Sequence, residues 1–238
     1  MTNELSSNAL SYRQEWDESY SRLENTLFYP SEEVVRFVNR YIRRRTGFAT
    51  FSKHFDARPS IVDIGSGAGR HLAYLWESGL HPVGIELSGV ACQQALEFME
   101  SKQAPRAEYD LINSSASQAG LADNSIDYGI SVSTLDSMPT SVALDVVATL
   151  RSSLKPGGLF YSDLISNESM RAGLSLDDSD QLVAEVHERG TIQSYYNETK
   201  IRRLFAGFDM VRFETITRSN NEGAVLEKRW HIVVRKPA

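Results

Sequence analysis

The stretch from residue 61 to residue 70, Ile-Val-Asp-Ile-Gly-Ser-Gly-Ala-Gly-Arg, constrains the fold of this chain more than any other segment. Its apolar start predicts a buried strand. The glycines that follow predict a tight turn with positive φ, which a ligand can approach closely. A second apolar run, residues 83–85, ends in Glu86, 21 positions after Gly65. An acid there can accept hydrogen bonds from both hydroxyls of a ribose, so the pattern predicts a site for a nucleoside-containing cofactor.

The spacing of the glycines separates two kinds of nucleoside site. A dinucleotide turn, Gly-x-Gly-x-x-Gly/Ala, needs a small third residue so that helix and strand can pack. Here that position is Arg70, and the third glycine falls one residue earlier, at Gly69. NAD and FAD are therefore disfavoured, and dinucleotide binding stays as an alternative.

The order Asp63-x-Gly65-x-Gly67-x-Gly69 resembles the first motif of class I S-adenosylmethionine-dependent methyltransferases. Later features follow in the order of this family, and together the resemblance covers about residues 58–236. They are the acid Glu86, the loop Asp-Asn-Ser-Ile-Asp at 123–127, the turn Leu-Lys-Pro-Gly-Gly at 154–158 and a closing pair of strands.

The resemblance implies an α/β, Rossmann-like fold. It implies a seven-stranded, mostly parallel sheet with a C-terminal antiparallel hairpin and an N-terminal helical cap. Residues 1–57 form the expected cap or lid, and residues 58–238 form the cofactor-binding domain, with a substrate-region insertion at 165–196. Strands are expected near 61–64, 83–85, 108–112, 126–132, 159–161, 210–217 and 229–234, and a helix from Asn197 through Phe205.

The resemblance also implies which residues contact S-adenosylmethionine, which would leave as S-adenosylhomocysteine. The adenine-facing Asp of the family is replaced here by Ser115, and Leu87 is placed to lie against the adenine. The expected cofactor contacts are Tyr29 from the cap and Asp63, Gly65, Ser66, Gly67, Glu86, Leu87, Ser115, Ala116 and Ser131 from the domain.

The cap is predicted to contain two helices. In the first, Trp16, Tyr20 and Leu23 recur at helical spacing as an apolar stripe. The second begins at Ser31 and is expected to stop at Gly47. It carries the stripe Val34, Val38 and Tyr41 and the bases Arg36, Arg40, Arg43, Arg44 and Arg45. Those bases suit the negative end of a helix dipole, and the alternative is a grip on a phosphate or carboxylate of the substrate.

The region 165–196 is expected to determine substrate specificity, because long insertions after a parallel strand lie above the cofactor crevice. If the acceptor is a hydroxyl, His187 is the candidate base and Tyr195 the second candidate. The only cysteine, Cys92, shares an apolar helical face and is assigned to the core. Asp136 and Asp163 fall near the metal ligands of magnesium-dependent relatives, but Leu164 replaces the expected Asn, and no metal is expected.

Composition limits the partners. The net charge of −6 disfavours a polyanion, so nucleic acid is not expected. No run approaches the ~20 apolar residues of a membrane span, and the sequence predicts a cytoplasmic protein. We therefore expect a methyltransferase acting on an oxygen or nitrogen of a small or medium-sized molecule. The alternatives are a non-catalytic partner subunit of the same fold and another transferase using S-adenosylmethionine, such as an aminopropyl transferase.

Overall fold

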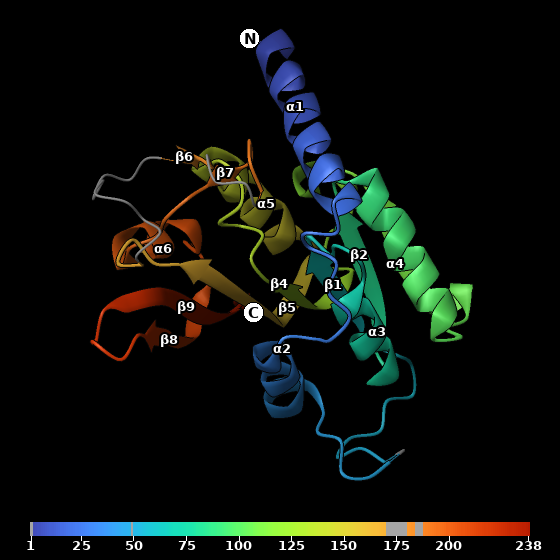
Figure 1. Cartoon of the computed structure of the whole chain (residues 1–238). Helices are drawn as coiled ribbons and strands as arrows, with labels where there is room; N and C mark the ends of the chain where they lie inside the picture. Colours follow the sequence, from blue (N-terminus) through green and yellow to red (C-terminus); the bar gives the residue numbers. More distant parts are fainter. Residues whose placement is uncertain (1, 49, 170–179, 184–187) are drawn as a thin grey trace.

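The chain is described by a computed structural model that covers residues 2–48, 50–169, 180–183 and 188–238, with side chains from Tyr12 onward. Seven strands form one sheet in the order β3-β2-β1-β4-β5-β9-β8 (Figure 1). Strand β9 runs antiparallel to β5 and β8, whereas the pairs from β3 to β5 are parallel. The predicted fold class is confirmed. The strands are β1 (Ser60–Ile64), β2 (His81–Glu86), β3 (Asp110–Asn113), β4 (Ile126–Ser131), β5 (Leu154–Ile165), β8 (Asp209–Ser219) and β9 (Val225–Arg235), with a separate short pair β6 (Gln181–Leu182) and β7 (Ile192–Gln193).

Helices cover both faces of this sheet (Figure 1). On one face pack α2, η1 and α3, with α4 beside α3, and on the other pack α5 and α6. The helices are α1 (Thr2–Ser21), α2 (Glu32–Phe37), η1 (Val38–Ile42, a π-helix), α3 (Arg70–Glu77), α4 (Gly89–Ser101), η2 (Arg106–Glu108), η3 (Ala116–Gln118), α5 (Thr140–Ser153) and α6 (Glu198–Leu204). Asn197 caps α6 by accepting the N–H of Lys200, as predicted.

Strand β1 explains why the motif at 61–64 is almost wholly apolar. Successive side chains of a strand point to opposite faces, and both faces of this sheet are covered. Ile61 therefore packs among α2, η1 and α3, whereas Val62 and Ile64 pack beneath α5. Asp63 points to the same face as Ile61, towards the start of α3, and is fully buried.

The segment expected to form a cap divides into two parts. Val34, Phe37, Val38 and Ile42 are buried in the main core, so α2 and η1 belong to the body of the domain. Helix α1 instead extends beyond the sheet and lies beside α4 (Figure 1).

Two helix ends differ from the sequence prediction. The helix capped by Ser31 ends at Ile42, not at Gly47, because Arg43 turns into extended backbone with φ −156° and ψ 138°. Its guanidinium then lies 3.9 Å from the ring centre of Phe51. Only Arg40 occupies the last turn, so the prediction that Arg43 and its two successors lie on this helix is wrong.

The first helix also ends early. It stops at Ser21, and Leu23 follows with φ +60° and a side chain that is 66% exposed. Leu23 therefore does not continue the apolar stripe. The stripe consists of Tyr20, which is buried, and Trp16, which is partly buried against it.

Candidate active site

The glycine turn lies between β1 and α3, at the carboxyl edge of the sheet. Gly65 and Gly67 have φ of +71° and +54°, a region that favours glycine. A Cβ on Gly65 would lie 2.2 Å from Thr134 Oγ1, and one on Gly67 would lie 2.6 Å from the Tyr20 hydroxyl. The turn is therefore enclosed by the loop after β4 and by helix α1.

Glu86 ends β2 directly beside this turn. Its Oε2 accepts the N–H of Gly67 at 2.9 Å, and its Oε1 accepts the N–H of Ser88 at 2.8 Å. Burial raises the pKa of Glu86, and the hydrogen bonds from the backbone oppose that shift. Each carboxylate oxygen has two lone pairs, so both can accept a further donor from a ligand.

Within the part of the chain that the structure describes, three buried polar side chains at the ends of β1 and β4 have atoms without a hydrogen-bond partner. They are both carboxylate oxygens of Asp63 and the hydroxyls of Ser66 and Ser131. Buried polar atoms are nearly always paired in folded proteins, so unpaired ones indicate where a ligand supplies the partner. Asp63 is an acceptor only, which calls for a donor such as an ammonium group.

Helix α1 is held at the carboxyl edge of the sheet by hydrogen bonds to the start of α4. Asp17 Oδ1 accepts the Ser88 hydroxyl at 2.6 Å and the N–H of Val90 at 3.2 Å. Tyr20 lies over the turn, and burial, together with the nearby charge of Glu86, raises its pKa well above the usual value. The sequence predicted an apolar stripe through Tyr20 but gave no sign that Tyr20 or Asp17 reaches the glycine turn.

The other residues predicted to contact a cofactor lie in different surroundings. Leu87 is partly buried directly after Glu86, and its carbonyl accepts from Asn113. Ser115 and Ala116 begin the short helix η3 beyond β3 and are partly buried. Tyr29 is 85% exposed, so its ring faces solvent. A role for Tyr29 stays a prediction.

Of the two candidate bases, the structure describes only Tyr195. Its side chain is buried against Ile165 at the end of β5, and its carbonyl accepts from Lys200. His187 lies outside the described residues. Their roles as bases stay predictions.

An ion cluster that the sequence did not predict lies beyond the ends of β4 and β5. Arg229, on β9, donates to Asp136 Oδ2 at 2.6 Å and to Asp163 Oδ2 at 2.9 Å. The backbone N–H groups of Ser133 and Ile165 donate to the same two carboxylates. One guanidinium therefore holds the two acids that the sequence placed near metal positions. Among the described residues, no group of three His, Cys, Asp or Glu side chains is arranged to hold a metal ion.

Burial raises the pKa of Asp136 to about 6, and the charge of Asp163 adds to this, although Arg229 acts in the opposite direction. Oδ1 of Asp136 is buried and has no hydrogen-bond partner. The cluster is close to the ends of β4 and β5, where a substrate would lie beside the glycine turn.

Comparison with known families identifies the central segment. Residues 61–158, which hold the glycine turn and Glu86, match a family model described as a methyltransferase domain. Residues 61–158 therefore carry the sequence pattern of a methyltransferase domain. This match is consistent with the S-adenosylmethionine-dependent methyltransferase superfamily that the motifs indicate. No curated protein sequence matches the chain.

Solved structures share the fold of this methyltransferase domain. A SAM-dependent methyltransferase from Methanosarcina mazei has a TM-score of 0.60 at 18% identity, covering 77% of this chain and 94% of that one. The 1,6-didemethyltoxoflavin-N1-methyltransferase of Burkholderia thailandensis, with bound 1,6-didemethyltoxoflavin and S-adenosylhomocysteine, has a TM-score of 0.55 at 18% identity, covering 76% and 72%. A 4+2 cyclase has a TM-score of 0.60 at 14% identity, covering 77% of each chain.

At these identities the likeness concerns the fold, and the cyclase is named for an activity other than methyl transfer. Within the described ranges, no helix is both long and apolar enough to cross a lipid bilayer.

The raised pKa of Asp136 predicts how stability depends on pH. The carboxyl binds its proton more tightly in the folded chain (pKa about 6) than in the unfolded chain (about 3.9), so its contribution is present below pH ~4 and is lost as pH rises to ~6. Relative to Asp136→Asn, the wild type should lose unfolding free energy on the order of 1 to 3 kcal/mol across this window. Urea unfolding at several pH values measures the difference. A difference that stays constant from pH 4 to 7 contradicts the assignment, and Asp145→Asn, an exposed carboxylate on α5, is the control.

Proposed function

We propose that this chain is an S-adenosylmethionine-dependent methyltransferase that acts on an oxygen or nitrogen of a small or medium-sized molecule. The observation that carries the proposal is the buried Glu86 carboxylate, which bridges the glycine turn to the start of α4 and keeps lone pairs for a ribose. Intact binding groups argue against a partner subunit that has lost its cofactor.

The residues at the carboxyl edge fit the parts of this cofactor. Glu86 offers two acceptors for the ribose hydroxyls, and the unpaired Asp63 carboxylate suits the ammonium of the methionine part. Leu87, Ser115 and Ala116 lie on the neighbouring loops, where the adenine is expected. The cofactor supplies a methyl group on a sulfonium, which is already a good leaving group, so the protein must mainly orient the acceptor and exclude water.

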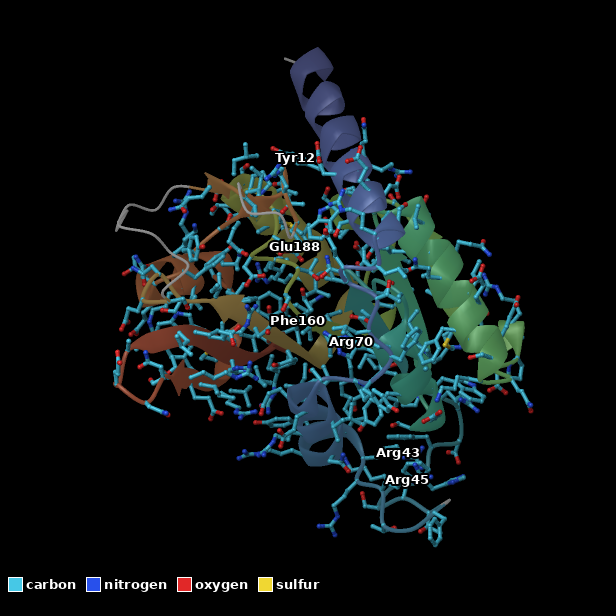
Figure 2. All side chains as sticks on the ribbon, in the orientation of Figure 1. Tyr12, Arg43, Arg45, Arg70, Phe160 and Glu188 are labelled. Carbon is cyan, nitrogen blue, oxygen red and sulfur yellow. The ribbon has the colours of Figure 1, made fainter. Side chains whose placement is uncertain are left out.

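Helix α1 and residues 188–190 lie close together at the carboxyl edge of the sheet, where they can exclude water from the site. Glu188 donates its backbone N–H to Glu24 Oε2 at 3.3 Å. A Cβ on Gly190 would lie 2.6 Å from Glu15 Oε2, so this part of the region 165–196 is close against α1. Figure 2 labels Glu188 near the lower part of α1 and Arg70, at the start of α3, below it. We infer that α1 and residues 188–190 together form part of the cover of the acceptor site.

The charge and the cover favour a small acceptor. The chain has a net charge of −6, which repels nucleic acid, and a covered site suits a molecule that fits beneath α1. The methyltransferase of Burkholderia thailandensis has bound 1,6-didemethyltoxoflavin and S-adenosylhomocysteine, which is consistent with this substrate class. We further propose a cytoplasmic location.

The cyclase of the same fold makes non-methylating chemistry the second candidate. Thermal-shift measurements with S-adenosylmethionine, S-adenosylhomocysteine, decarboxylated S-adenosylmethionine and NAD separate the cofactors. Release of S-adenosylhomocysteine when a library of hydroxyl and amine acceptors is added then tests methyl transfer. Binding without release under all acceptors would favour the second candidate.

The role of Glu86 predicts a loss of cofactor affinity. Glu86→Ala removes charge-assisted hydrogen bonds worth ~1.5 to 3 kcal/mol, so the affinity for S-adenosylmethionine should fall roughly tenfold to a hundredfold. Isothermal titration calorimetry measures the dissociation constant, and thermal unfolding checks that the turn still folds. Glu100→Ala, an exposed acid on α4, is the matched control. An unchanged constant in Glu86→Ala would refute the ribose assignment.

The cover predicts that α1 responds to the cofactor. Asp17→Ala removes the acceptor that ties α1 to Ser88 and Val90, so the affinity for S-adenosylhomocysteine should fall while the fold is retained. In the wild type, amide protection from Trp16 to Tyr29 should rise when S-adenosylhomocysteine is added. Glu18→Ala, on the exposed face of the same helix, should leave unchanged both the affinity for S-adenosylhomocysteine and the rise in amide protection. Equal exchange with and without ligand in the wild type would contradict a lid.

A further inference from the structure

The sequence assigned no role to His71, but the structure places it between two parts of the site. It is the second residue of α3 and is only 3% exposed. Its Nδ1 lies 3.6 Å from Oδ2 of Asp63. On the other side of the ring, Nε2 accepts the backbone N–H of Ser31 at 3.2 Å. One imidazole therefore contacts both the buried acid and the start of α2.

The contact with Ser31 fixes the tautomer of the ring. A backbone N–H can only donate, so Nε2 must present its lone pair. The proton of the neutral imidazole is then on Nδ1, which faces Asp63. The separation of 3.6 Å is too long for a hydrogen bond, so Nδ1–H attracts the Asp63 carboxylate electrostatically and leaves its lone pairs open.

Because His71 makes no hydrogen bond to Asp63, both carboxylate oxygens of Asp63 can accept hydrogen bonds from a ligand. Both of its oxygens are buried and lack a hydrogen-bond partner. A carboxylate in this state is costly unless donors reach it, and the ammonium group of the proposed cofactor would supply them. The role assigned to His71 below therefore rests on the proposed function, because it requires that this cofactor binds at Asp63.

Ser31 connects His71 to the N-terminal segment. Its side chain accepts the N–H of Val34 and caps α2, and the chain before it, residues 22–30, leads back to α1. A shift of His71 would therefore move the cap of α2 and the linker that follows α1. Because α2 is buried in the core, the linker is the part that can respond.

We propose that His71 is a positioning residue that couples the orientation of Asp63 for the cofactor to the docking of the linker at residues 27–31. Its Nδ1–H side acts on cofactor affinity, and its Nε2 side acts on the order of the linker. Neither contact includes the methyl group or the acceptor.

Two substitutions separate the sides of the ring. In His71→Asn the amide nitrogen lies near the position of Nδ1, so the donor towards Asp63 is kept and the acceptor for Ser31 is lost. In His71→Gln the amide oxygen reaches the position of Nε2, so the acceptor for Ser31 is kept and the donor is lost. Calorimetry with S-adenosylhomocysteine measures affinity, and amide exchange at residues 27–31 measures linker order.

The proposal predicts opposite patterns. His71→Gln should weaken S-adenosylhomocysteine binding roughly threefold to tenfold, no more than the loss of one hydrogen bond, with exchange at residues 27–31 as in the wild type. His71→Asn should bind within about twofold of the wild type, with faster exchange at residues 27–31. A purely structural histidine would instead lower the melting temperature in both variants and change affinity and exchange together, and that result overturns the proposal.

His71→Phe, which keeps the ring shape and loses both polar contacts, completes the test. It should show both defects, and wild-type affinity and exchange in this variant would also overturn the coupling. If the wild type itself binds no S-adenosylhomocysteine, the proposed function and the coupling both fail. If the wild type binds it and all three variants match the wild type, only the coupling fails.

Discussion

The bridge made by the Glu86 carboxylate is the interaction on which the site depends. It joins the N–H of Gly67 in the glycine turn to the N–H of Ser88 before α4, and so ties the ends of β1 and β2 together. Because the carboxylate is buried, its charge is balanced by backbone dipoles and not by a basic side chain. The glycine turn and the contact of α1 with Ser88 both adjoin this bridge.

The second constraint is the burial of three acids, which have two different kinds of surroundings. Asp136 and Asp163 share Arg229, whereas Asp63 has only the nearby Nδ1 of His71. Arg229 offsets part of the cost of burying Asp136 and Asp163, but a buried carboxylate without a hydrogen-bond donor needs a ligand or a polar neighbour to support it. The difference between Asp63 and the other two acids supports the proposal that Asp63 faces the ligand.

Much of the fold could be predicted from the sequence, because its local patterns are strong. The apolar run of β1, the glycines after it and the cap at Asn197 each determine structure within a few residues, and the order of motifs then gives the sheet. Helix ends were predicted less well. Leu23 and Arg43 leave their helices because of backbone conformation and an aromatic contact, and neither leaves a clear sign in the sequence.

The site was predicted only where its residues are neighbours in the motif. Asp17 and Ser88 are 71 positions apart, and Asp136 and Arg229 are 93 positions apart, so no spacing rule brings them together. Tyr20 has the spacing of a core aromatic, and only the fold shows that it covers Gly67. The role of His71 is hidden for the same reason, since Ser31 precedes it by 40 positions.

A crystal structure with bound S-adenosylhomocysteine tests the central claim most directly. The arrangement described above predicts that both ribose hydroxyls donate to Glu86, that the ammonium group lies against Asp63 and that Tyr20 stays over the glycine turn. A nucleoside bound away from the carboxyl edge, or a Glu86 that contacts only Gly67 and Ser88 when the ligand is present, would contradict it.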